Sequence, residues 1–296
     1  MLTIVLLLLG LLTLYFAVVF IKDYVETAKQ GKLEKENFAA LGAVGFLTNF
    51  FDTLGIGSFA PTTALFKLFK LTSDRTIPGT LNVSMTIPVV AEAFIFITVI
   101  KVEPITLLSM LGAATVGAVF GAGIVSKLDE KKVQIGMGIA LAVVALIMLA
   151  SQLKLFPAGG DAIGLTGIKL IVAIVANFIL GALMTLGIGL YAPCMALVFA
   201  LGMSPKVAFP IMMGSCAFLM PAASVKFVKE GAYDRKASLA ITIFGTIGVF
   251  VAAYIVKSLP LTTLKWLVIV VILYTSIMMF RSATKNAKEE NNKKVA

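Results

Sequence analysis

The sequence contains no histidine, only two cysteines and one tryptophan, and just 14% of its 296 residues are charged. The absence of histidine excludes His-ligated zinc, haem with a histidine ligand and catalytic triads built on histidine. No CxxC pair, Walker A motif or GxGxxG context is present either, so nothing predicts a cofactor or an ATP-driven motor. We expect no metal site and no catalytic site. Cys194 and Cys216 lie inside apolar segments and are interpreted as packing residues.

Long polar segments are also absent, whereas 59% of the residues are hydrophobic and the mean hydropathy is +1.02. No soluble core needs that much apolar surface, and several apolar stretches reach the roughly 20 residues that span a bilayer. The net charge of +10 comes from basic residues in short loops, which is typical of an orientation signal and not of nucleic-acid binding. The sequence therefore predicts an all-α polytopic membrane protein in a lipid bilayer.

After the first apolar span, the chain is a series of segments that occurs twice. The stretch "TLGIGSFAP" (53–61) returns as "TLGIGLYAP" (185–193). Further along, "GAVFGAGIVSKL" from Gly117 matches "GVFVAAYIVKSL" from Gly248. Ordered matches of this kind indicate a duplication. We therefore predict an unpaired first span with its loop, a first repeat, a linker, a second repeat and a disordered cytoplasmic tail: 1–36, 37–151, 152–165, 166–281 and 282–296.

Each repeat begins with a long apolar block, 37–69 or 167–202, that Gly-Ile-Gly and a proline interrupt. Glycine permits unusual backbone angles and proline removes a backbone donor, so each block is predicted to be a helix, a break and a second helix. The second helix has about 12 residues and rises about 18 Å, which is too short for a hydrocarbon core of about 30 Å.

The basic residues indicate how these blocks meet the membrane. If each block is a hairpin that returns to its own side, all but six of the 25 Lys and Arg residues fall on one side, in segments 22–36, 67–75, 127–132, 226–236 and 281–296. The other side has Lys101, Lys154, Lys169, Lys206, Lys257 and Lys265. Blocks that crossed once would give a weaker bias. The positive-inside rule therefore favours hairpins, an N-terminus outside and a cytoplasmic C-terminus.

A hairpin adds no crossing, so each repeat crosses three times and the second repeat is upside down relative to the first. The predicted fold is an inverted repeat of two homologous halves, with seven membrane crossings plus two opposed re-entrant broken-helix hairpins. The composition fits a prokaryotic cell (inner) membrane. It predicts no particular oligomeric state.

The two breaks are predicted to face one central site, because irregular backbone is tolerated in a membrane only where protein or a water-filled cavity satisfies it. Each short helix would begin there, and its N-terminal N–H groups would attract a small anionic substrate. Nearby hydroxyls, amides and glycines are the candidate ligands: Thr53, Gly55, Gly57, Ser58, Thr62, Asn82, Thr185, Gly187, Gly189, Tyr191 and Ser215. Ordinary helix–helix hydrogen bonding or close packing is the alternative role for each.

Two acidic residues lie in apolar segments: Asp52 precedes the first break, and Glu92 lies within the next span. An acid inside a membrane is costly in its charged form and is a functional candidate by default. Either residue could carry a coupling proton. The alternatives are a structural ion pair, a hydrogen bond within the hairpin or, for Asp52, exposure to solvent. In the second repeat Met184 and Val225 take their places.

A glycine-rich break followed by proline, duplicated in a chain of this length, resembles the TauE/SafE sulfite exporter family, also called the toluene sulfonate uptake permease family. The resemblance covers residues 37 to 281, although many members have a longer glycine run than Gly55-Ile-Gly57. It implies secondary transport of sulfur-containing anions such as sulfite, thiosulfate or organosulfonates. The residues by themselves imply a small anion, moved with protons or by the membrane potential.

The resulting hypothesis is a secondary transporter that works by alternating access. An anion channel-like conduit is an alternative, which would pass larger currents and would not saturate. An intramembrane enzyme is a weaker alternative, because the chain lacks histidine and paired catalytic acids.

Overall fold

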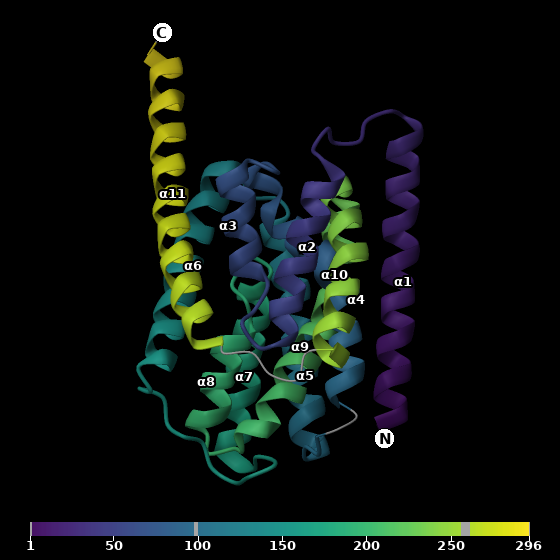
Figure 1. The fold of residues 1–296 in the computed structure, drawn as a ribbon, viewed down its shortest axis with the longest axis vertical. Helices are drawn as coiled ribbons and strands as arrows, with labels where there is room; N and C mark the ends of the chain where they lie inside the picture. The colour runs from purple at the N-terminus through teal and green to yellow at the C-terminus, as the bar shows by residue number, and fades with distance from the viewer. Residues whose placement is uncertain (1, 98–99, 256–260, 296) are drawn as a thin grey trace.

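The computed structural model describes residues 2–97, 100–255 and 261–295. Within these residues the chain is a bundle of α-helices without a β-strand (Figure 1). The helices are α1 (Leu2–Lys29), α2 (Phe38–Thr53), α3 (Phe59–Phe69), the short 3-10 helix η1 (Asp74–Thr76), α4 (Ile77–Ile97), α5 (Pro104–Val125), α6 (Glu130–Gln152), α7 (Gly167–Met184), α8 (Tyr191–Ala200), α9 (Pro205–Lys229), α10 (Arg235–Ile255) and α11 (Leu261–Val295).

Eight helical segments in the described part of the chain are long and apolar enough to cross a membrane: α1, η1 with α4, α5, α6, α7, α9, α10 and α11. This confirms the prediction of an all-α polytopic membrane protein. Seven of the eight are the predicted crossings. The eighth is α7, which we predict to be the first arm of the second hairpin; it has 18 residues, whereas the matching α2 has 16.

Both predicted breaks are present as interruptions between helices. The short helices that follow them, α3 and α8, have 11 and 10 residues. The connecting backbone turns at glycines in the left-handed region, with φ of +87° at Gly55, +90° at Gly57 and +107° at Gly187. Residues with side chains rarely adopt such angles, so the Gly-Ile-Gly sequence explains why both helices stop where they do.

One end of the bundle collects the segments that hold most of the basic residues. The polar contacts that connect them are Arg235–Asp23, Thr72–Asp234, Gln134–Asp74 and Lys67–Ser282. At the other end, backbone hydrogen bonds join the loop before α7 to the segments before α5 and α9. α2 begins and α3 ends at the end with the basic segments. α7 begins and α8 ends at the opposite end (Figure 1). Lys257, predicted for the opposite end, lies outside the described residues.

The packing of helices repeats between the two halves of the chain. α2 packs on α10 as α7 packs on α5, and α4 packs on α10 as α9 packs on α5. Matching glycines make the closest approaches: a Cβ at Gly248 would lie 2.4 Å from the Phe46 carbonyl oxygen, and one at Gly117 would lie 2.0 Å from that of Phe178. Small residues let membrane helices approach this closely. The repeats therefore interlock, while their inverted insertion and the re-entrant hairpins stay predictions.

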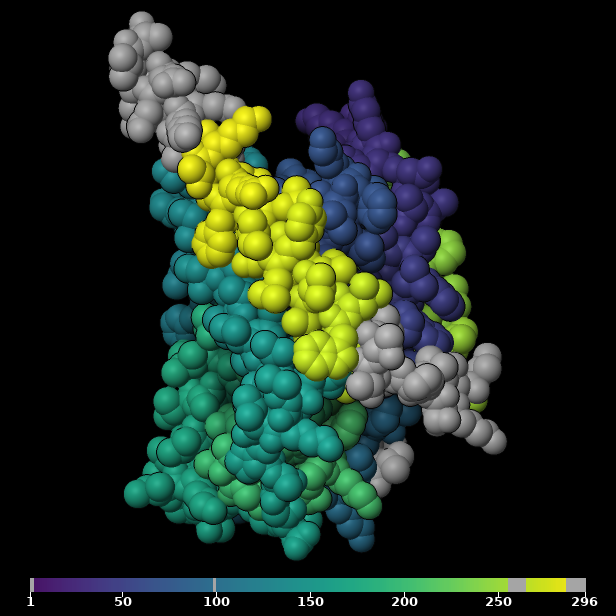
Figure 2. Space-filling view, turned by 60° about the vertical axis from the view of Figure 1, so that its left-hand side comes forward, coloured from purple at the N-terminus to yellow at the C-terminus, as the bar shows by residue number. Residues whose placement is uncertain are grey.

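The two terminal helices lie at the edges of the bundle. α1 has no counterpart in the repeat and packs along α9 and α4. α11 crosses the outside of α6 and α3 (Figure 2). It continues as a helix through Val295, in the region where we predict a disordered tail. Residues 282–295 contain neither glycine nor proline, and their lysine, glutamate and alanine residues favour helix.

Candidate functional site

The two breaks lie against one cavity of about 30 Å³. Residues of both breaks line it: Asp52, Gly57 and Ser58 from the first, and Gly189, Leu190 and Tyr191 from the second. Side chains of α4, α6, α7 and α9 complete its wall. The fold thus brings together two segments that are far apart in the sequence. We call this space the inner cavity.

Both short helices begin at the inner cavity. Ser58 and Leu190 are the N-cap residues of α3 and α8, and neither side chain caps its helix. The first residues of each helix, Phe59 and Tyr191, also line the cavity. The first N–H groups of a helix lack partners within the helix and carry a partial positive charge. Two helices therefore present an anion-attracting end to the same space.

Glu92 of α4 is completely buried, and it connects the two breaks. The hydroxyl of Thr53, the last residue of α2, lies 2.8 Å from Glu92 Oε1, and the Tyr191 hydroxyl donates to Oε2 across 2.7 Å. The Thr53 hydroxyl is also 2.9 Å from the carbonyl oxygen of Asn49. Within the described part of the chain no basic side chain forms a salt bridge with Glu92. Neutral hydroxyl groups alone hold this acid.

Asp52 is also buried, and it lines the inner cavity itself. Its Oδ2 accepts a hydrogen bond of 2.7 Å from the Ser58 hydroxyl, so Asp52 is bonded within its own hairpin and does not face solvent. The helix ends attract an anion, whereas an ionised carboxylate on the cavity wall repels one. An arrangement of this kind can make anion binding depend on protonation.

Three predicted ligands of the second repeat contact other parts of the helix bundle. The Thr185 hydroxyl donates across 2.7 Å to a carbonyl oxygen of α7. A Cβ at Gly187 would lie 3.0 Å from the Met137 side chain, so this glycine faces α6 and not the inner cavity. The Ser215 hydroxyl accepts a hydrogen bond of 2.9 Å from Asn177, which joins α9 to α7. These contacts are of the kind expected for close packing or helix–helix hydrogen bonding.

Three predicted ligands of the first repeat also lie away from the inner cavity. Asn82 is buried in α4, where its side-chain amide donates across 2.8 Å to the carbonyl oxygen of Pro78. Thr62 is buried in α3, and its hydroxyl has no hydrogen-bond partner among the described residues. Gly55 lines a neighbouring cavity and not the inner one.

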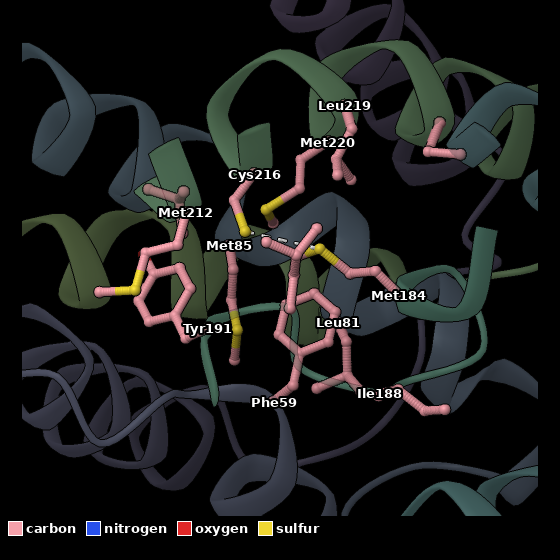
Figure 3. Packing of buried hydrophobic residues seen from close by; sticks show 14 of the residues in the cluster. Phe59, Leu81, Met85, Met184, Ile188, Tyr191, Met212, Cys216, Leu219 and Met220 are labelled. Atoms are coloured by element: carbon pink, nitrogen blue, oxygen red, sulfur yellow. Dashed lines mark hydrogen bonds between the residues drawn. The ribbon is translucent and has the colours of Figure 1, made fainter. Parts of the chain in front are cut away.

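Met184 and Cys216 line the inner cavity, although neither belongs to the predicted set. Their sulfur atoms lie 3.6 Å apart (Figure 3). Met184 has a signal in the sequence, because it occupies the position of Asp52 in the second repeat. Cys216 has no such signal, because a lone cysteine in an apolar helix is normally interpreted as a packing residue.

A second cavity, of about 70 Å³, adjoins the inner cavity. Four residues line both: Ile56, Met148, Tyr191 and Ala192. The rest of its wall includes Gly55, Ser151 near the end of α6 and Lys265 near the start of α11. Ser151 is exposed, so this cavity reaches the surface of the bundle. We call it the vestibule.

Broken helices that meet at a cavity inside the helix bundle are typical of membrane transporters. The profile of the sulfite exporter TauE/SafE family matches residues 2–148 and 169–296, which is nearly the whole chain. The protein therefore belongs to the TauE/SafE family, a family of membrane transporters. A comparison with curated proteins finds no match.

Proposed function

We propose that this protein is a secondary transporter that moves a small sulfur-containing anion, such as sulfite, thiosulfate or an organosulfonate, by alternating access. The observation that carries the proposal is the meeting of two helix N-termini at one buried cavity. Family membership supports sulfur as the element. The basic segments at one end of the bundle support a C-terminus in the cytoplasm and an N-terminus outside, and the composition supports a prokaryotic inner membrane.

The glycines of the breaks leave room for an anion at the helix ends. A Cβ at Gly57 would meet no atom within 4 Å, and one at Gly189 would meet only the Cβ of Phe59, at 3.9 Å. Ser58 and Tyr191 also line this space, and their hydroxyl groups donate to Asp52 and Glu92. A cavity of about 30 Å³ has room for a water molecule. Transport would then require the two broken helices to move relative to each other, so that the anion can enter and leave this space.

Hydrogen-bond accounting supports a proton on Glu92. The Thr53 hydroxyl has one proton but two acceptors within reach, Glu92 Oε1 and the carbonyl oxygen of Asn49. If Oε1 carries a proton, Glu92 donates to Thr53 and Thr53 donates to Asn49, so that every group has a partner. A neutral Glu92 also removes a negative charge that would repel the substrate. We therefore assign the coupling proton to Glu92 and keep Asp52 as the second candidate.

Four residues close the end of the bundle where the basic segments gather. Lys67 of α3 forms a salt bridge with Asp74 of η1 and donates to the Ser282 hydroxyl of α11 across 2.9 Å. Gln134 of α6 donates to the same carboxylate across 2.8 Å. We call these four residues the closing network. It ties together α3, η1, α6 and α11.

The matching place in the other repeat is hollow. Extending the match of the two repeats pairs Ser282 with Ser151 and Gln134 with Lys265. Ser151 and Lys265 line the vestibule, whereas their counterparts belong to the closing network. Equivalent residues therefore form a network of contacts at one end of the bundle and line a cavity at the other. Alternating access requires such a difference, and the exchange of the two arrangements would carry the anion across.

Counterflow in liposomes that contain the purified protein tests this proposal. Labelled sulfite, thiosulfate and a small alkyl sulfonate are offered in turn, and saturable exchange of at least one is expected. Gly189→Leu should abolish the exchange because it fills the inner cavity. Gly112→Leu is the matched control, since a Cβ at Gly112 meets nothing within 4 Å and the residue lies outside the site. Flux that never saturates would instead indicate a channel-like conduit.

A second variant tests the coupling. Glu92→Gln keeps the shape of the side chain and can still accept from Tyr191 and donate to Thr53. It should keep exchange at equal pH but lose accumulation driven by a pH gradient. Glu26→Gln, at an exposed position of α1, is the control. Accumulation that persists in Glu92→Gln would contradict this role and leave Asp52 or the membrane potential as the source of energy.

A further inference from the structure

Lys265 places a positive charge in the wall of the vestibule. Its side chain is half-buried. Among the described residues it forms no salt bridge, and none of the residues that line the vestibule is acidic. A cation in a concave, partly apolar surface that no carboxylate neutralises attracts anions from solution.

Neutral polar residues line the same space. Ser151 and Gln152 lie at the end of α6 and line the vestibule with Lys265. The vestibule measures about 70 Å³, against about 30 Å³ for the inner cavity. The vestibule therefore offers a small oxyanion more room than the inner cavity does.

Tyr191 is one of the four residues that lie between the two spaces. It lines the vestibule and the inner cavity, while its hydroxyl is bonded to Glu92. An anion that moves from the vestibule to the inner cavity therefore comes close to the side chain that also contacts the proposed proton site. An anion on this path would therefore meet Lys265 in the vestibule and then Tyr191 beside the inner cavity.

We propose that the vestibule is a separate binding subsite for a small oxyanion, with Lys265 as its charged ligand and Ser151 as its neutral ligand. The subsite rests on the proposed function in one respect, namely that the bound anion is the transported one. It holds the anion before the broken helices move apart. Lys265 then acts on the affinity for the substrate and not on the rate of the conformational change.

Trp266 provides a direct test. It is the only tryptophan of the chain and follows Lys265 in α11. Its fluorescence in the purified full-length protein is titrated with sodium sulfite, thiosulfate and sulfate at constant ionic strength. We expect a saturable change with at least one anion. Lys265→Gln should weaken the apparent affinity by about tenfold or more, because a charge-assisted hydrogen bond is lost. Lys265→Arg should retain it to within a few fold.

Lys169→Gln is the matched control. Lys169 lies at the same end of the bundle, but it donates to the carbonyl oxygen of Leu201 and does not line the vestibule. Ser151→Ala, at an exposed position, provides a milder variant if Lys265→Gln fails to fold, with an expected loss of a few fold. In counterflow, Lys265→Gln should raise KM and leave the maximal rate unchanged.

The outcomes separate this subsite from the proposed function. Saturable binding that depends on Lys265, without transport of any sulfur anion, would support the subsite and remove the substrate assignment. Transport with the same KM and the same titration curve in Lys265→Gln would overturn the subsite and leave the transporter standing. The absence of a saturable response to all three anions in the unaltered protein would also overturn the subsite.

Discussion

The hydroxyl of Tyr191 donates to the carboxyl group of Glu92 across 2.7 Å. This bond links the helix after the second break to α4, which belongs to the first repeat. It is one of the polar contacts through which the two broken helices are held at a common site, and it has no counterpart on the other side, where Phe59 occupies the position of Tyr191 in the repeat.

Tyr191→Phe should lower the free energy of unfolding by about 1–2 kcal/mol, because it removes one donor from a buried acceptor. Thermal unfolding of the protein in detergent measures the change. Tyr254→Phe is the control, since Tyr254 is 70% exposed and its loss should change little. Equal stability of Tyr191→Phe and the unaltered protein would show that this bond does not hold the two helices together.

Substitution by alanine should have different effects at three glycines. Gly117→Ala should destabilise the fold by about 1–3 kcal/mol through overpacking, because its Cβ would lie 2.0 Å from the Phe178 carbonyl oxygen. Gly57→Ala should cost roughly 1–2 kcal/mol of backbone strain at a φ of +90°. Gly189→Ala should change stability by less than about 0.5 kcal/mol, but should weaken anion exchange because the methyl group enters the inner cavity.

Thermal unfolding and counterflow, measured on the same three variants, separate packing from function. Gly189→Ala should be the only one of the three that loses exchange without losing stability. A Gly189→Ala protein with unchanged exchange would argue against an anion at the second helix end.

The closing network should control access to Cys216, which lines the inner cavity. Asp74→Asn weakens the salt bridge to Lys67, so the end that holds the network should open more often. Alkylation of Cys216 by a small, membrane-impermeant thiol reagent, applied from that end, should become several times faster. The reversed pair Lys67→Asp with Asp74→Lys should restore a slow rate.

Two controls accompany the alkylation experiment. Cys194→Ala removes the other thiol, which is buried and does not line the inner cavity. Asp129→Asn breaks an exposed salt bridge to Lys132, and exposed pairs of this kind contribute little. The role of the network would be contradicted if Asp74→Asn and Asp129→Asn alkylated at the same rate.

The stability of the end with the basic segments should depend on pH through Asp234, which lies in the loop before α10. Burial raises the pKa of Asp234 from 3.8 to about 6, and the nearby carboxylates of Glu34 and Glu36 add to the rise. Hydrogen bonds from Ala237 and Thr72 oppose it. Because the folded state holds this proton more tightly than the unfolded state, the contribution is full below about pH 4 and is lost as the pH rises through about 6.

The loss amounts to about 3 kcal/mol at most. Asp234→Asn keeps a good N-cap residue and removes the titration, so the melting temperature of this variant should fall less between pH 4 and pH 7 than that of the unaltered protein. Asp161→Asn, at an exposed position of the other end, should leave the pH profile unchanged. Parallel profiles for Asp234→Asn and the unaltered protein would contradict the prediction.

The sequence by itself determined the class of protein and the places where its helices break. Apolar length decides which segments can cross a bilayer, and Gly-Ile-Gly with proline decides where a helix stops, because both are local properties of the backbone. The duplication then predicted that Gly57 and Gly189 belong together, and both line the inner cavity. The apolar surroundings also singled out Asp52 and Glu92, because an acid is rare in such a segment.

Only the tertiary structure decided which polar groups meet. Thr53, Glu92 and Tyr191 come from three separate helices, and no local pattern specifies which helix faces which. Matching residues of the repeats also diverge: Gly55 lines the vestibule, whereas Gly187 packs against α6. The reason is physical, since different side chains surround the two breaks: Phe209 lies nearest to Gly55, whereas Met137 and Leu81 lie nearest to Gly187. Residues at equivalent positions therefore have different neighbours.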